Sequence, residues 1–172
     1  MPTMKDRSVG VVGAGRVGTA LGLALGRAGY DLVGVTARSA GSRERAARIL
    51  PGTPVLDLPA VAKSADILIL AVTDDAIERV AAELAAGGHL HRGQIVFHAS
   101  GACGLAVLAS AADVGAVPFA IHPAMTFPGL ETDVENLAGL AYAITSWPAD
   151  RPLAEELVRD LGGVPVWIAD ED

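Results

Sequence analysis

Three glycines near the amino terminus have the spacing of a turn that binds phosphate. They lie in residues 13–18, GAGRVG, which fit the pattern G-x-G-x-x-G. A valine-rich run at 8–12 precedes the turn, as in a strand buried on both faces, and apolar residues at helical spacing follow it. Gly13 would permit the bend, Gly15 would admit a pyrophosphate, and Gly18 would let the helix lie close to the strand. This context predicts a dinucleotide-binding turn.

The start of the helix predicted after the turn offers free N–H groups and a partial positive charge to phosphate oxygens. We therefore expect every residue of the turn to contact the cofactor, namely Gly13, Ala14, Gly15, Arg16, Val17 and Gly18. The alternative interpretation is a glycine-rich turn that serves packing alone.

The end of the second predicted strand, 30–36, bears on the choice of nucleotide. A carboxylate there would bind the ribose hydroxyls of NAD, but residues 36–39 read TARS and contain no acid. Asp31 stands at the start of the strand, which is the wrong end for that contact. The planar guanidinium of Arg38 suits a 2′-phosphate, so we predict NADP as the cofactor, with NAD less favoured. The predicted contacts on this side are Thr36, Arg38 and Ser39. Arg43 and Arg45 would add positive charge, unless these arginines only solvate a helix.

Three further segments follow predicted strands, and ligands of such sheets bind beyond the carboxyl ends of the strands. Small residues at Ala71, Val72 and Thr73 would allow close contact along the dinucleotide. Asp75 is interpreted as a helix-capping residue rather than a ligand.

Two histidines stand at the other strand ends and are the candidates for acid–base chemistry. His98 and His122 could donate to a developing oxyanion or relay a proton, although a histidine at a strand end can be purely structural. Ser100 could hydrogen-bond the substrate or the nicotinamide amide, and Gly101 beside it is expected to contact the cofactor. The predicted catalytic residues are therefore His122, His98 and Ser100.

Alternating strands and helices must position these residues. Strands are predicted at 8–12, 30–36, 66–72, 94–97, 114–121, 140–145 and 164–168, with a brief one at 55–56. Helices are predicted at 17–28, 39–50, 59–64, 76–86, 105–111 and 150–161. This alternation is typical of a doubly wound, mostly parallel α/β sheet with helices on both faces. Pro118 suggests that its strand lies at a sheet edge or pairs irregularly. We expect residues 1–172 to form a single dinucleotide-binding domain.

Composition excludes several classes of function. The net charge is −7 and no stripe of Lys or Arg is present, which argues against nucleic acid as a partner. One cysteine, Cys103, forms no internal disulfide and favours a reducing compartment. Neither a signal core nor an apolar run of membrane-spanning length occurs, so we expect a cytoplasmic chain without membrane contact. No metal site is expected from the Cys, His and Asp spacings, and a G-x-S-x-G nucleophile turn is absent.

Four segments carry a resemblance to a known family. They are GAGRVGTALGLAL at 13–25, AVTDDAIERVA at 71–81, FHASGA at 97–102 and IHPAMTF at 121–127. Together they resemble Rossmann-like proteins of poorly defined activity, a family similar to pyrroline-5-carboxylate reductase, ketopantoate reductase and the 6-phosphogluconate/β-hydroxyacid dehydrogenases. The resemblance covers nearly the whole chain.

The resemblance implies a Rossmann fold that binds NADP and belongs to an oxidoreductase. The reaction would transfer hydride from NADPH to a carbonyl or imine of a small, ketopantoate-like metabolite. The alternative is a non-catalytic NADP-binding or redox-sensing module. The family also implies a C-terminal helical domain, absent from this chain, that closes over the nicotinamide. Because that domain mediates dimerisation, we expect a homodimer only where it is present.

Overall fold

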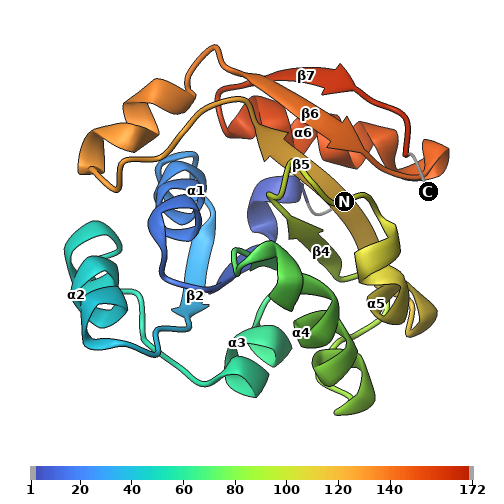
Figure 1. Ribbon diagram of the computed structural model, residues 1–172, viewed down its shortest axis with the longest axis horizontal. Coiled ribbons are helices and arrows are strands. Elements are labelled where there is room, and N and C mark those ends of the chain that lie inside the picture. Colours follow the sequence, from blue (N-terminus) through green and yellow to red (C-terminus); the bar gives the residue numbers. More distant parts are fainter. Residues whose placement is uncertain (1–2, 171–172) are drawn as a thin grey trace.

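A single mixed sheet forms the centre of the molecule in the computed structural model, which describes residues 3–170 (Figure 1). Its strand order is β2-β1-β3-β4-β5-β6-β7. The strands are β1 (Ser8–Val12), β2 (Asp31–Val35), β3 (Ile67–Leu70), β4 (Ile95–His98), β5 (Val117–Pro123), β6 (Ala141–Thr145) and β7 (Val164–Trp167). The first five strands pair in parallel, β6 runs antiparallel to β5, and β7 is parallel to β6. The predicted doubly wound, mostly parallel α/β fold is confirmed.

Six α-helices are assigned within residues 3–170, together with short 3-10 turns. They are α1 (Arg16–Arg27), α2 (Ala40–Ile49), α3 (Leu58–Ser64), α4 (Asp74–Ala86), α5 (Ala109–Asp113) and α6 (Arg151–Asp160). The 3-10 turns are η1 (Met4–Asp6), η2 (Ala106–Leu108), η3 (Glu131–Leu137) and η4 (Pro148–Asp150). No helix of this described part of the chain is both long enough and apolar enough to cross a membrane.

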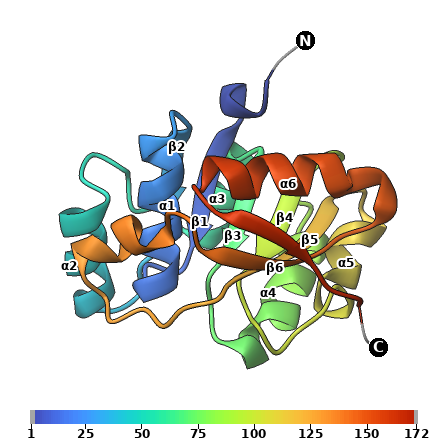
Figure 2. The ribbon, with the colours of Figure 1, turned by 90° about the horizontal axis from the view of Figure 1, so that it is seen from above.

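The central strands are buried on both faces, which explains their continuous apolar sequences. In β3, Ile67 and Ile69 pack into the core layer with α1, α2 and α6, while Leu68 and Leu70 pack with α3 and α4. All four side chains are at most 1% exposed. Successive side chains of a strand point to opposite faces, so a helix layer is needed on each side. Figure 2 shows α6 and α4 on opposite sides of the strands.

The far end of the sheet is covered on one face only. Tyr142 and Ile144 of β6 are buried in the layer that contains α6. In β7, the side chains of Val164 and Val166 are 52% and 46% exposed. They alternate along the strand with the side chains that face α6. Within residues 3–170, no second helix layer covers this end of the sheet.

The strand that contains Pro118 is not at the sheet edge, which corrects the sequence-based expectation. β5 lies between β4 and β6. Val117 donates its N–H to Gln94 of the β4 side, so the Pro118 nitrogen faces the β6 side. Pairing with β6 begins only at Ala120, so a residue without an N–H is tolerated there. The alternative expectation of irregular pairing fits this position.

Smaller boundary differences also appear. The brief strand predicted at 55–56 is a single parallel bridge between Val55 and Val35. The predicted helix at 105–111 divides into η2 and α5. Ser39 caps α2, and its hydroxyl accepts the Ser42 N–H at 3.0 Å.

Candidate functional site

The glycine turn joins β1 to α1 at the carboxyl edge of the sheet. Gly13 has a φ of +103°, and a Cβ there would lie 2.4 Å from the Ala71 carbonyl oxygen. A Cβ on Gly18 would lie 2.1 Å from the Gly13 carbonyl oxygen. Gly15 caps α1 in extended backbone, and a Cβ there would meet no atom within 4 Å. Close contacts within the chain thus leave no room for a side chain at Gly13 and Gly18, whereas Gly15 borders open space.

Thr36, at the end of β2, holds this turn in place. The Gly13 N–H donates to Thr36 Oγ1 at 2.9 Å, and the Ala14 N–H donates to the Thr36 carbonyl at 2.9 Å. Arg45 reaches the same turn, since its Nη1 lies 3.4 Å from the Ala14 carbonyl oxygen. The Thr36 hydroxyl is therefore a positioning group for the turn.

A cleft of about 1080 Å³ opens beside the turn. Most of the predicted cofactor residues line it, namely Gly13, Ala14, Gly15, Thr36, Arg38, Ser39, Ala71, Val72 and Thr73. The strand order explains the position of the cleft. The chain leaves β1 toward β2 on one side and leaves β3 toward β4 on the other, so the loops after β1 and β3 diverge at the carboxyl edge of the sheet.

A smaller pocket of about 320 Å³ continues from this cleft. The two share Gly15, Ala71, Val72 and Thr73. The smaller pocket adds three of the predicted residues, which are Arg16, Val17 and Ser100. Of the predicted cofactor residues, Gly18 and Gly101 line neither space. Gly18 is buried beneath the turn, and Gly101 lies against His122.

Asp75 is not the helix cap that was predicted. α4 begins at Asp74, and its N-cap residue is Thr73, whose side chain makes no capping hydrogen bond. Asp75 lies within the first turn, where its carboxylate interacts favourably with the helix dipole.

His98 is fully buried and both of its ring nitrogens are engaged. Nε2 lies 2.9 Å from the Gly104 carbonyl oxygen and therefore carries the proton, while Nδ1 accepts the Ser100 N–H at 3.2 Å. Burial is the main cause that lowers the pKa of His98. This neutral ring fixes the loop after β4, and neither nitrogen is left to face a substrate.

His122 has a different environment at the end of β5. It is half-buried, and its Nδ1 lies 2.9 Å from the Ala99 carbonyl oxygen. A carbonyl only accepts, so Nδ1 carries the proton and Nε2 of the neutral ring is an acceptor. Ser100 accepts the Ala102 N–H at 3.1 Å through Oγ. The structure thus brings His98, Ser100 and His122 into one cluster between β4 and β5.

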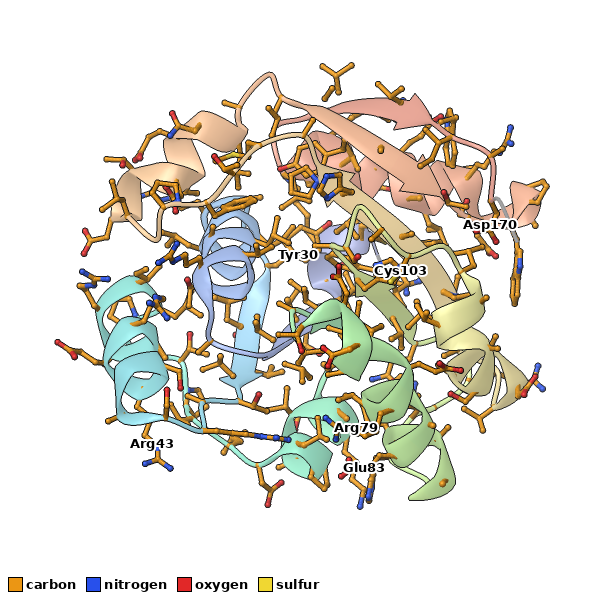
Figure 3. The ribbon with its side chains drawn as sticks, viewed as in Figure 1. Tyr30, Arg43, Arg79, Glu83, Cys103 and Asp170 are labelled. Atoms are coloured by element: carbon orange, nitrogen blue, oxygen red, sulfur yellow. The ribbon has the colours of Figure 1, made fainter. Side chains whose placement is uncertain are left out.

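Several cleft residues were missed by the sequence analysis. Segment 55–58 and the α4 residues Ala76, Arg79 and Val80 also line the larger cleft. The spacing of the three α4 residues would place them on one helix face, but nothing local shows what that face meets. Figure 3 shows Arg79 on α4 and Arg43 on α2, and both line this cleft. Within residues 3–170, no group of three or more His, Cys, Asp or Glu side chains is placed to hold a metal ion.

A family profile described as Rossmann-like domain matches residues 3–123, which is more than half of the chain. The chain belongs to the Rossmann-like domain family. The resemblance seen in the four sequence segments is confirmed. No curated protein matches the chain.

Solved structures share this fold at low sequence identity. Prephenate dehydrogenase from A. aeolicus, solved with NAD+, is 16% identical with a TM-score of 0.77 over 98% of this chain and 61% of its own. Pyrroline-5-carboxylate reductase from Coxiella burnetii is 20% identical, with a TM-score of 0.70 over 96% of this chain and 60% of its own. The imine reductase from Streptomyces aurantiacus is 16% identical, with a TM-score of 0.72 over 95% of this chain and 56% of its own. The chain thus spans about three fifths of the length of these proteins.

Proposed function

We propose that this chain is the NADP-binding domain of an oxidoreductase that acts on a small carbonyl or imine compound. The main support for this proposal is the glycine turn at the start of α1. Gly15 of this turn borders open space and lines both the larger cleft and the smaller pocket. Open space at Gly15 lets a phosphate approach the backbone N–H groups at a helix start. The solved neighbours are named as reductases and dehydrogenases, which supports the same class of reaction.

The residues present fit a nicotinamide dinucleotide. The turn would hold the diphosphate, the larger cleft the adenosine half, and the smaller pocket with Ser100 the nicotinamide half. Arg38 lines the larger cleft, and no described residue forms an ion pair with it. This free guanidinium favours NADP over NAD. When bound, the cofactor supplies the hydride, and the protein supplies orientation and charge stabilisation.

His122 is the remaining candidate for acid–base work among the predicted catalytic residues. In its protonated form the Nε2 would donate to a substrate oxygen or nitrogen, while the Ala99 carbonyl fixes the ring through Nδ1. Ser100 would anchor the substrate or the nicotinamide amide from the smaller pocket. We assign His98 the support of the loop that presents Ser100.

Thermal unfolding with NADPH or NADH tests the binding part of this proposal. A nucleotide at 100 times its Kd should stabilise the chain by about 2.7 kcal/mol. We expect a larger shift with NADPH than with NADH at equal concentration. The absence of a shift with either nucleotide would contradict dinucleotide binding.

NADPH oxidation with a panel of keto acids and cyclic imines tests the chemical part. We expect the His122→Gln variant to reduce turnover about 100-fold while its NADPH affinity stays within twofold of wild type. Unchanged turnover would remove the acid–base role of His122. Binding of NADPH without turnover of any compound would favour a non-catalytic redox-sensing module.

A further inference from the structure

The larger cleft carries an excess of positive charge that one arginine does not account for. Arg38 of the β2–α2 loop, Arg43 of α2 and Arg79 of α4 all line it. Asp57 is the only carboxylate among the described lining residues, and its Oδ1 accepts the Ala60 N–H at 2.8 Å as the cap of α3. The cleft is thus suited to an anion with more than one negative charge.

Arg79 belongs to the face of α4 that borders the cleft. Ala76 precedes Arg79 by three residues and Val80 by four, and all three line this space. Glu78 and Glu83 of this helix do not line it, although Glu83 lies one turn beyond Arg79 (Figure 3). No residue between 3 and 170 forms an ion pair with Arg79. Its guanidinium is therefore free for a ligand.

The topology places Arg79 across the cleft from the other two arginines. α2 follows β2 and α4 follows β3, and these strands flank β1 on opposite sides. A side chain from α4 therefore approaches the space beyond β1 from the opposite direction to Arg38. Guanidinium groups on two walls can share the three oxygens of a phosphate monoester.

We propose that Arg79 is a second specificity-determining residue, which binds the 2′-phosphate of the adenosine ribose from the wall opposite Arg38. This inference rests on the proposed NADP-binding function. It adds a residue of α4 to the predicted cofactor contacts. A role for Arg79 in solvating α4 would leave nucleotide affinity unchanged. A role in stacking on adenine would act on nucleotides with and without the 2′-phosphate alike.

Calorimetric titration of the chain with two adenosine nucleotides separates these roles. Adenosine 2′,5′-bisphosphate and adenosine 5′-monophosphate differ only in the phosphate of interest. We expect Arg79→Ala to weaken the bisphosphate about tenfold while 5′-monophosphate affinity stays within twofold of wild type. Arg79→Lys should lie between the two, because it retains the charge without the planar fork. The control Arg48→Ala removes an exposed α2 arginine outside the cleft and should change neither affinity.

The outcomes distinguish this inference from the function on which it rests. An Arg79→Ala variant that binds both nucleotides as wild type does, or loses both equally, would overturn the role of Arg79 alone. If wild type binds NADH and NADPH equally, the roles of both Arg79 and Arg38 at the 2′-phosphate are overturned, while dinucleotide binding itself stands. If wild type binds neither dinucleotide, the proposed function fails and the inference fails with it.

Discussion

At the scale of single residues, the three glycines of the turn have different physical tasks. Gly13 combines a positive φ with contact to the Ala71 carbonyl, and Gly18 lies directly against the Gly13 carbonyl. These two positions leave no room for a side chain whether or not a ligand is bound. Gly15 has ordinary extended backbone and open space around it, so the chain itself does not require a glycine there. Its role is expected to concern the ligand.

Alanine substitutions should separate these tasks. We expect Gly18→Ala to lower the free energy of unfolding by about 2 kcal/mol or more, because its Cβ would overlap a backbone oxygen. Gly15→Ala should leave that free energy within about 0.5 kcal/mol of wild type but weaken NADPH binding at least tenfold. Urea denaturation and calorimetric titration check the two results. A Gly15→Ala variant that binds NADPH normally would argue against phosphate at this residue.

At the scale of elements, a buried imidazole holds the loop between β4 and η2. His98 ends β4, donates to Gly104 and accepts from Ser100, so it joins both ends of this loop. The Ala99 carbonyl within the loop then orients His122 of β5. The position of both candidate catalytic side chains therefore depends on a neutral His98.

The buried neutral ring predicts a pH-dependent stability. Because burial lowers the pKa of His98 below the ordinary histidine value of about 6.5, the unfolded chain takes up a proton that the folded chain does not. Stability is therefore lost as the pH falls below about 6.5, with a slope of at most about 1.4 kcal/mol per pH unit for one group. We expect His98→Asn to be less stable at neutral pH but to have a shallower slope between pH 6.5 and 5. Urea denaturation between pH 6.5 and 5 measures this slope for wild type and for His98→Asn.

If His98→Asn lost stability with acid as steeply as wild type, another group would be responsible. NMR titration of the wild-type imidazoles gives the pKa of His98 independently of any variant.

At the scale of the whole molecule, distant parts of the chain meet around α6. Tyr30, which precedes β2, donates its hydroxyl to Asp160 Oδ2 at 2.6 Å across 130 residues. Lys5 lies 3.7 Å from the other oxygen of the same carboxylate. The amino-terminal βα units are thus tied to the last helix. Tyr142 of β6 is fully buried, but its hydroxyl has no hydrogen-bond partner among the described residues.

The two tyrosines form a matched pair for mutation to phenylalanine. Tyr30→Phe removes a hydrogen bond to a charged group and should lower the free energy of unfolding by about 1.5–3 kcal/mol. Tyr142→Phe removes a buried polar atom without a partner and should raise it by about 1 kcal/mol. Thermal and urea unfolding of both variants will show whether the two changes in the free energy of unfolding have opposite signs. Equal destabilisation by both changes would mean that Tyr142 has a partner, such as a buried water.

The sequence by itself determined the features that depend on local sterics and periodicity. The glycine turn and the buried strands around it are visible because each is encoded within a few consecutive residues. Continuous apolar strands also imply a parallel sheet, since only helices on both faces can cover them. The family resemblance further indicated that the segments at 13–25, 71–81, 97–102 and 121–127 belong to one Rossmann-like domain.

Only the tertiary structure decided which side chains meet. Arg79 joins the cleft because β3 lies beside β1, and His98 loses its free nitrogens because the following loop folds back on it. Pro118 is accommodated inside the sheet because β6 pairs only from Ala120 onward. These outcomes depend on contacts that strand order and loop paths create, and no periodicity within one segment encodes them.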